Sequence, residues 1–237
     1  MTEQPATPLF AVDPTTIAYG RKVVIDSLAF QIDKPQIIGM VGPNGVGKTT
    51  LLRFLAGSIP GTGDRLRVND LSPKQKSLYN KSIFFLEDVS TLDDRFKGID
   101  YLRYVQRLWR SKRPISEIIE SFSMQRFIKK PISSYSQGME QLLVLAMAFI
   151  SDTAVLLLDE PMNCLDPTNR IVVQDLLRQY RQQGKCIILS THQLAEIDGL
   201  ADMVWFIKDA GIAYTRLPGD QLSSQQIYED IYLKPVV

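Results

Sequence analysis

The chain has 237 residues, of which 45% are apolar and 22% are charged, so we expect a folded globular protein and exclude general disorder. Its 27 Lys and Arg side chains against 26 Asp and Glu give a net charge of +1, which lacks the basic excess typical of proteins that bind nucleic acid. Two cysteines are too few for a disulfide framework and indicate a reduced, cytoplasmic compartment, and no run approaches the roughly 18 to 20 apolar residues that span a bilayer.

Short apolar runs bounded by turn residues alternate with amphipathic stretches, which is typical of an α/β sheet covered by helices. The first signal along the chain is a period of two at Leu28, Phe30 and Ile32. It predicts a half-buried strand and a small antiparallel portion near the start. Continuous apolar runs, which predict buried strands, lie at residues 37–41, 83–86, 154–158 and 186–189.

A different pattern separates the second and third of these runs. Residues 98–110 and 114–127 carry apolar side chains at helical spacing, and no strand-like run interrupts them. We therefore expect residues 89–150 to form a mostly helical insertion.

The last elements are a predicted hairpin and a predicted short helix. Two apolar runs at residues 203–207 and 212–215 flank a turn, in which we expect Gly211 to supply the positive φ. Residues 223–232 are expected to form the helix.

The strongest motif lies between the buried strand at residues 37–41 and the following helix, where it fits the phosphate-binding loop pattern. Glycines allow successive amide N–H groups and the helix N-terminus to face an anion, Lys48 adds a point charge, and Thr49 offers a hydroxyl to Mg²⁺. The alternative is an ordinary glycine-rich turn. The residues expected to bind nucleotide here are Gly42, Pro43, Asn44, Gly45, Val46, Gly47, Lys48, Thr49 and Thr50.

Two carboxylates, Asp159 and Glu160, directly follow the apolar run at residues 154–158. They are expected at the carboxyl end of a buried strand, near the phosphate loop. Asp159 would hold Mg²⁺, and Glu160 would accept a proton from the attacking water or orient that water. Acidic residues at strand ends are common, so this pair indicates a catalytic site only in combination with the phosphate loop.

The order of these motifs resembles the nucleotide-binding subunit of ABC transporters, of the export type, over about residues 17–207. The segment Tyr135-Ser136-Gln137-Gly138-Met139 is similar to the family's signature, usually Leu-Ser-Gly-Gly-Gln, and departs from it at three positions. The resemblance implies that Ser136, Gln137 and Gly138 contact the nucleotide of a partner chain. An ordinary capped helix start is the alternative.

Three further residues are similar to functional positions of the family. Asp166 lies in a segment that resembles the D-loop at the dimer seam. His192, the only histidine of the chain, matches the switch histidine that contacts the γ-phosphate. Tyr19 lies where the family stacks an aromatic ring on adenine. The respective alternatives are a turn, a structural histidine and a tyrosine at a strand end.

The family's Q-loop glutamine, which touches Mg²⁺, has no counterpart in the segment Phe85-Leu86-Glu87-Asp88. Either Asp88 or Glu87 could take its place, because a carboxylate oxygen also ligates a hard cation. We favour Asp88 as a metal-contacting residue. A solvated acidic loop is the alternative.

The resemblance implies an α/β fold, with a P-loop NTPase (RecA-like) core, an inserted helical subdomain and a small antiparallel β portion. The whole of residues 1–237 would form one ABC ATPase domain. The core would take about residues 1–88 and 151–237, and the helical subdomain about residues 89–150.

The function implied is an ATP-binding and ATP-hydrolysing subunit that uses Mg²⁺ and dimerises around ATP with a second copy or a sister subunit. It would drive export through an integral membrane permease, from the cytoplasmic face of the membrane. Aromatic residues are expected to receive that permease in a groove, and the alternative for each ring is that it packs in the core. These residues are Phe85, Phe96, Tyr101, Tyr104 and Trp109. The alternatives are a soluble ABC ATPase in cofactor assembly or another mechanical role, and a regulator that binds nucleotide without hydrolysis.

Overall fold

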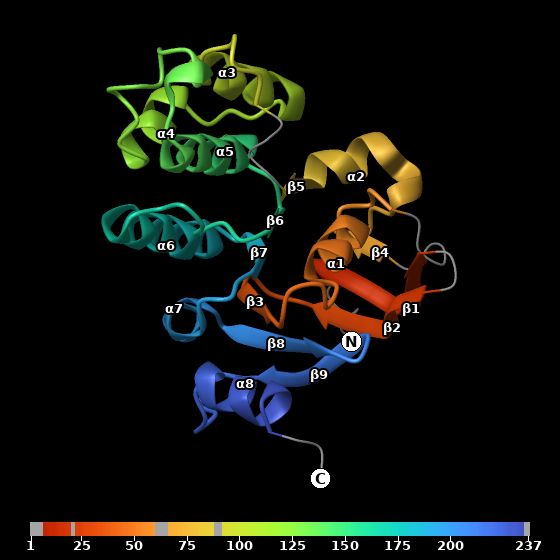
Figure 1. The fold of residues 1–237 in the computed structure, drawn as a ribbon. Coiled ribbons are helices and arrows are strands. Elements are labelled where there is room, and N and C mark those ends of the chain that lie inside the picture. The colour runs from red at the N-terminus through yellow and green to blue at the C-terminus, as the bar shows by residue number, and fades with distance from the viewer. Residues whose placement is uncertain (1–6, 20–21, 60–65, 88–91, 235–237) are drawn as a thin grey trace.

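The computed structural model describes residues 7–19, 22–59, 66–87 and 92–234 (Figure 1). Its main sheet has six strands in the order β5-β6-β7-β3-β8-β9, all parallel except β9, which pairs antiparallel with β8. The strands are β3 Ile37–Val41, β5 Ile83–Leu86, β6 Val155–Leu158, β7 Cys186–Ser190, β8 Met203–Lys208 and β9 Gly211–Arg216. The four predicted buried strands are thus confirmed, with bounds shifted by at most one residue.

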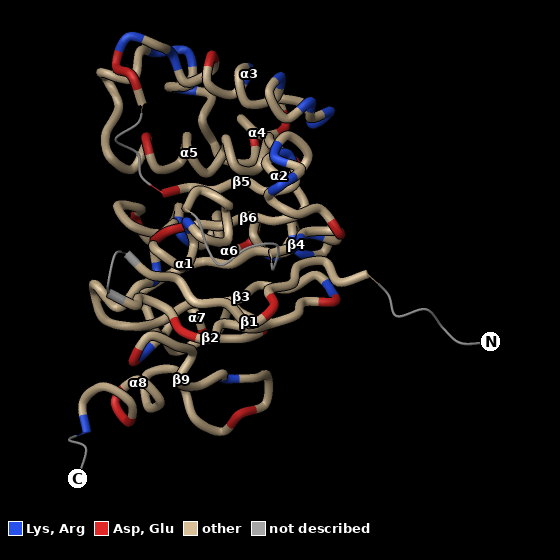
Figure 2. Tube along the Cα trace, turned by 90° about the vertical axis from the view of Figure 1, so that its right-hand side faces the viewer, with Lys and Arg blue, Asp and Glu red and all other residues tan. Residues whose placement is uncertain are grey.

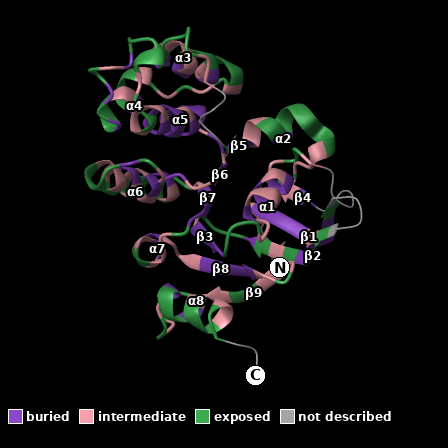
Figure 3. Ribbon diagram, viewed as in Figure 1, coloured by how far each residue is buried: buried purple, intermediate pink, exposed green. Residues whose placement is uncertain are grey.

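The central strands are buried on both faces, as the purple strands in Figure 3 show. In β6, Leu156 and Leu158 pack into a core on the side of α5 and α6, whereas Val155 and Leu157 pack into a second core on the side of α1 and the antiparallel sheet. Because both faces exclude water, such strands consist almost entirely of apolar residues. This explains why the sequence shows continuous runs here instead of alternation.

A separate three-stranded antiparallel sheet, in the order β2-β1-β4, covers one face of the main sheet beside α1. It consists of β1 Phe10–Tyr19, β2 Lys22–Ile32 and β4 Leu66–Val68, and it confirms the predicted antiparallel portion. The sequence analysis did not predict β1. Pro14 interrupts its pattern, and the register of β1 against β2 shifts between Val12 and Thr15, as expected where a proline is accommodated within a strand.

Eight helices are described, besides short 3₁₀ turns at Pro73–Gln75 and Ile132–Ser134. Figures 1 and 2 show α3, α4 and α5 grouped at one end of the molecule and α8 near the other. No helix within the described residues is long and apolar enough to cross a membrane. The helices are α1 Lys48–Leu55, α2 Lys76–Ser82, α3 Gly98–Trp109, α4 Ile115–Ser121, α5 Gln137–Ser151, α6 Pro167–Gln182, α7 Leu194–Leu200 and α8 Ser224–Tyr232.

Two of the predicted helices end earlier than the sequence suggested. The helix expected over residues 98–110 ends at Trp109, because Arg110 adopts a left-handed φ of 57°. The helix expected over residues 114–127 ends at Ser121, and Ser123 has a φ of 53°. Positive φ stops a helix whatever the spacing of the apolar residues beyond it. The predicted short helix near the C-terminal end is confirmed as α8.

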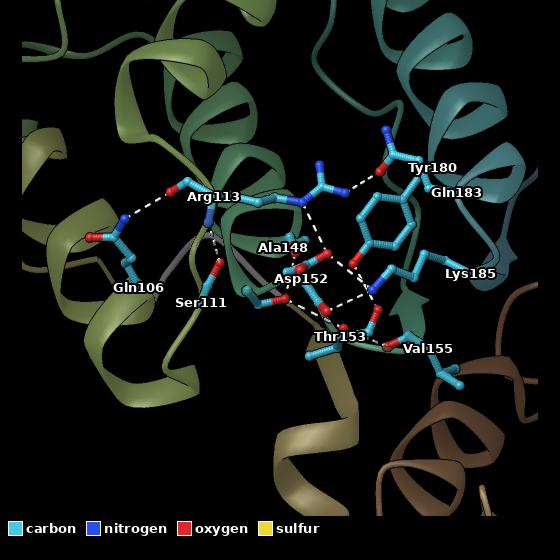
Figure 4. Close-up of polar contacts among 11 residues, drawn as sticks. Gln106, Ser111, Arg113, Ala148, Asp152, Thr153, Val155, Tyr180, Gln183 and Lys185 are labelled. Carbon is cyan, nitrogen blue, oxygen red and sulfur yellow. Dashed lines mark hydrogen bonds and ion pairs between the residues drawn. The ribbon is translucent and has the colours of Figure 1, made fainter.

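Asp152 ties the α3–α5 group to the amino ends of β6 and β7 (Figure 4). Its carboxylate accepts from Arg113 Nε at 3.0 Å and from Lys185 Nζ at 3.0 Å. Both cations also lie over the Tyr180 ring, at 5.1 and 5.7 Å from its centroid. Burial raises the pKa of Asp152, but the hydrogen bonds from Lys185 and Arg113 outweigh it, and the net shift is downward. The contact between the α3–α5 group and the two strands therefore contains an ionised carboxylate between two cations.

The predicted hairpin is present as β8 and β9, but the residue expected to shape its turn is wrong. Asp209 and Ala210 adopt φ values of 48° and 62°, whereas Gly211 pairs with Lys208 as the first residue of β9. Positive φ at both central residues is the pattern of a type I′ turn. An alanine is strained in that conformation, because its Cβ crowds the following carbonyl oxygen.

We expect Ala210→Gly to raise the free energy of unfolding by about 1 kcal/mol, since glycine adopts positive φ without that crowding. Ala213→Gly is the matched control, because Ala213 lies exposed in β9 without a positive φ, and there glycine should destabilise. Denaturant unfolding of both variants measures the difference. Equal destabilisation by both substitutions would contradict the strain at Ala210.

Candidate nucleotide site

The glycine-rich loop connects the end of β3 at Val41 to the start of α1 at Lys48. Gly45 and Gly47 adopt φ values of 80° and 116°. At Gly47 a Cβ would also lie 2.9 Å from Val24 Cγ1, so glycine is needed there for both reasons. The loop lines a cavity of about 530 Å³ together with Asp159 and Glu160, and Thr50 lies in the same wall.

Lys48 extends back along the loop, and its Nζ donates to the Gly42 carbonyl oxygen at 2.7 Å. The residue is only 7% exposed. Burial lowers the pKa of Lys48, while the charges of Glu160 and Asp159 act in the opposite direction. A poorly hydrated cation in a cavity gains most from an anionic ligand. The cavity thus combines free loop amides, a helix N-terminus and a buried ammonium group, which together suit phosphate.

Asp159 and Glu160 follow β6 and face the loop. The Asp159 carboxylate accepts hydrogen bonds from Thr49 Oγ1 and from Ser190 Oγ. Ser190 in turn accepts from the Glu160 amide N–H at 2.8 Å. Thr49 and Asp159, which the sequence analysis assigned to Mg²⁺, are therefore brought together by the fold.

His192 lies beyond β7, and its Nδ1 is 2.9 Å from Glu160 Oε2. The His192 side chain is 60% exposed, whereas that of Glu160 is 23% exposed. Glu160 has a φ of 47°, a left-handed conformation that local side-chain contacts must maintain. The imidazole thus lies within hydrogen-bond distance of a carboxylate that lines the cavity, although His192 itself is not among the lining residues.

A second cavity, of about 570 Å³, lies at the start of α5 and holds Ser136, Gln137 and Gly138. Ser136 is the N-cap of α5 and accepts from the Met139 amide at 3.3 Å. A Cβ on Gly138 would lie 2.9 Å from the Cys164 carbonyl oxygen, so the close approach of this loop requires glycine. The wall also includes Asp166, which caps α6 by accepting from the Asn169 amide at 2.9 Å, a hydrogen bond that lowers the pKa of Asp166.

The two cavities have no lining residue in common among the residues that the structure describes. One contact nevertheless links their walls, because the buried Gln141 of α5 donates from Nε2 to the Pro161 carbonyl oxygen at 2.9 Å. Pro161 directly follows Glu160. The start of α5 is thus attached to the carboxylate segment without entering its cavity.

Some expected residues are not placed at the site. Asp88 lies outside the described residues, as does the side chain of Tyr19, whose backbone ends β1. Glu87 is described, and its carboxylate forms an ion pair with Arg53 of α1. The choice between Glu87 and Asp88 as a metal-contacting residue therefore stays a hypothesis.

Sequence reasoning assigned no role to Ser190 or Gln141, and it did not place Val23, Val24 and Ala210 in the wall of the first cavity. The two valines come from β2 and the alanine from the β8–β9 turn, elements distant from the loop in sequence. Ser190 had one available signal, because it ends an apolar strand run as the first polar residue. Such a residue in a parallel sheet lies at the carboxyl edge, where sites form.

Comparisons with known proteins identify the family to which the chain is similar. Residues 25–163 match the family described as ABC transporter. The Nod factor export ATP-binding protein I of Rhizobium meliloti (strain 1021) is 34% identical over 205 residues, which cover 83% of this chain and 61% of that protein. The lantibiotic transport ATP-binding protein SrtF of Streptococcus pyogenes is 26% identical over 196 residues, 82% of this chain and 85% of that protein.

A solved structure described as the ATP binding subunit of an ABC transporter has a TM-score of 0.87 with 19% identity, and the match covers 94% of this chain and 98% of that one. At this identity the likeness is one of fold. The chain spans about three fifths of the length of the Nod factor export protein that it matches.

Ser190→Ala is expected to lower the free energy of unfolding by roughly 1–3 kcal/mol, because the Glu160 amide loses a buried acceptor and Asp159 loses a donor. The reoriented Asp159 should also weaken binding of Mg-ATP. Ser151→Ala is the control, since its buried hydroxyl bonds the Ala148 carbonyl oxygen away from the cavity. Denaturant unfolding and calorimetry separate the two effects, and wild-type Mg-ATP affinity in Ser190→Ala would refute a positioning role.

Proposed function

Because the chain belongs to the ABC transporter family, we propose that it binds and hydrolyses ATP as the motor subunit of a transport system and that two such chains close around the nucleotide. One observation carries the proposal. The loop cavity and the Ser136–Gly138 cavity are separate within one chain, so both can act on one nucleotide only if the second cavity comes from another chain. That chain would be a second copy or a sister subunit.

The first cavity would hold the phosphates of ATP. Amides of the loop and Lys48 would bind the β- and γ-phosphates, as the buried ammonium group favours. Tyr19 would stack on the adenine from the end of β1.

Mg²⁺ would be held by Thr49 and Asp159. The fit rests on their direct hydrogen bond, which places a hydroxyl and a carboxylate oxygen side by side at the cavity. The described residues contain no cluster of three acidic, histidine or cysteine side chains that would hold a metal alone. Mg²⁺ is typically bound by one or two carboxylates together with substrate phosphates and water, so this sparse donor set suits it. The ion would neutralise charge on the phosphates during transfer.

Glu160 is proposed to orient the attacking water and accept its proton. Its carboxylate lines the cavity, and His192 lies within hydrogen-bond distance of it. His192 would hold Glu160 in position and reach the γ-phosphate from the open side. Asp88 is proposed to contact the metal from the segment after β5.

Closure of the dimer would depend on the γ-phosphate. Ser136 and Gly138 present a hydroxyl and an amide at the N-terminus of α5, a 15-residue helix, and both can bind an anion. ATP offers the terminal phosphate to this group, whereas ADP does not, so hydrolysis removes the interaction that holds the pair closed. Asp166 would lie at the seam between the chains.

Closure of the dimer would act on a permease that docks in a groove of about 890 Å³ between α2 and α3. Phe85 and Trp109 line this groove, whereas Phe96, Tyr101 and Tyr104, which were expected in the same groove, line a separate cavity of about 370 Å³. The subunit would thus lie on the cytoplasmic side of a membrane. Export is the proposed direction, because matched relatives are named for export of Nod factor and transport of lantibiotics.

Glu160→Gln is expected to bind ATP and form a stable dimer with turnover reduced by on the order of 10² or more, because the amide cannot accept the proton from water. Light scattering with Mg-ATP measures the dimer, and phosphate release measures the turnover. Lys48→Ala is the comparison variant and should lose ATP binding and remain monomeric. A Glu160→Gln protein that stays monomeric at saturating Mg-ATP would overturn the proposal.

A further inference from the structure

The charge of the chain is unevenly distributed. Residues 74–130 contain thirteen of the 27 Lys and Arg side chains but only seven of the 26 Asp and Glu. This segment therefore carries a net charge of +6, and the remainder of the chain carries −5. Figure 2 shows the basic residues gathered along α2 and α3.

The outer face of α3 combines basic and apolar side chains. Arg103 and Arg107 are four residues apart, which places them on one side of the helix, Arg110 is its C-cap, and all three are exposed. Tyr104 and Leu108 follow the first two arginines and are 62% and 48% exposed. Cationic and apolar groups thus share one surface.

The basic surface continues across the groove on α2. Lys76 and Lys81 line the groove from α2, and Leu108 lines it from α3. Lys76 is exposed, and Leu78 between the two lysines is 54% exposed. The two helices therefore present similar edges on either side of the groove.

Several basic side chains outside this segment pair with carboxylates, and within it Arg103 lies 3.5 Å from Asp100. Arg170 bonds Glu196 at 3.1 Å, and Lys185 bonds Asp152 at 3.0 Å. In contrast, Lys76, Arg107 and Arg110 have no ion-pair partner among the residues that the structure describes. Clustered like charges repel one another, and an external anionic surface would relieve that repulsion.

We propose that the exposed face of α2 and α3 rests on the anionic phospholipid headgroups of the membrane. This inference depends on the proposed function, in which the groove between these helices receives a membrane permease. Anionic lipids attract Lys and Arg near their surface by an amount that corresponds to about fivefold in affinity for each residue. Tyr104 and Leu108 would enter the interfacial region, where amphipathic and apolar side chains gain from contact with lipid.

The arrangement favours lipid over an acidic protein segment. The cations lie on the outer surfaces of two helices, and Arg103, Arg107 and Arg110 are all exposed. Recognition of one defined carboxylate requires a fixed and partly buried cation, as Arg113 provides for Asp152. Exposed cations on two neighbouring helices instead suit a fluid layer of many phosphate groups, each of which binds weakly.

Sedimentation with lipid vesicles tests the inference on the full chain without any membrane protein. We expect the protein to bind vesicles of equal phosphatidylglycerol and phosphatidylcholine, to ignore pure phosphatidylcholine, and to dissociate in about 1 M salt, where screening shortens to roughly 3 Å. The variant Arg103→Gln/Arg107→Gln/Arg110→Gln, whose three positions lie outside the groove, should bind the anionic vesicles on the order of 10² more weakly.

The matched control is Lys34→Gln/Arg178→Gln/Lys234→Gln, which removes the same charge from the segment before β3, from α6 and from the segment after α8. It should bind anionic vesicles as the wild type does. Equal loss in both triple variants would show that net charge alone governs binding and would overturn the proposal. Wild-type protein that binds neither vesicle, or both equally, would also overturn it.

The experiment distinguishes failure of the lipid proposal from failure of the proposed function. The charge variant should hydrolyse ATP in solution at the wild-type rate, since its substitutions lie outside the nucleotide cavity. Loss of vesicle binding with normal hydrolysis locates the defect at the α2–α3 face. If the wild type ignores anionic vesicles but the variant loses copurification with a permease in detergent, the face docks protein and the lipid proposal fails.

Discussion

The site depends on the parallel register of three neighbouring strands. β7 pairs with β3 through Met40 and Ser190 and with β6 through Leu158 and Leu189. Parallel strands in register end at the same edge of a sheet, so the phosphate loop after β3, the carboxylates after β6 and the Ser190–His192 segment after β7 must meet. Ser190 fixes that meeting, because one hydroxyl bonds both the Asp159 side chain and the Glu160 backbone. A shift of any strand by one residue would separate Thr49 from Asp159.

The sequence predicted those parts of the molecule that local chemistry determines. Strands buried on both faces appear as unbroken apolar runs, and the phosphate loop requires glycines that its pattern records. Contacts between segments that are distant in the sequence were harder to predict. The need for glycine at position 47 arises partly from Val24 on another sheet, and that at position 138 from the Cys164 carbonyl group. The turn residue of the hairpin was predicted wrongly, because Asp209 and Ala210 adopt the positive φ although Gly211 is next to them. Pairing of the strands can therefore outweigh the conformational preference of one turn residue.

The α5 helix is attached at both ends to the carboxylate-bearing strand. At its start, Gln141 bonds the Pro161 carbonyl group, which follows Glu160. At its end, Asp152 caps the helix and precedes β6, held between Arg113 and Lys185. A dimer contact at Ser136 and a change at Glu160 would therefore act on one connected segment. Under the proposed function, binding of the partner chain at Ser136 would thereby influence the site where ATP is hydrolysed.

The opposite connection runs through α1, from the phosphate loop toward the groove between α2 and α3. The helix begins at Lys48, and the turn that follows it, Ala56 to Ser58, lines the groove between α2 and α3. Tyr79 of α2 is fully buried and donates to the Leu55 carbonyl oxygen at 2.7 Å, and Arg53 pairs with Glu87 after β5. An eight-residue helix spans about 12 Å, so under the proposed function a displacement of the loop by nucleotide would be carried along α1 to the groove. The basic α2–α3 face would hold that groove against the bilayer, and movement of α1 would then act on the permease instead of only reorienting the subunit.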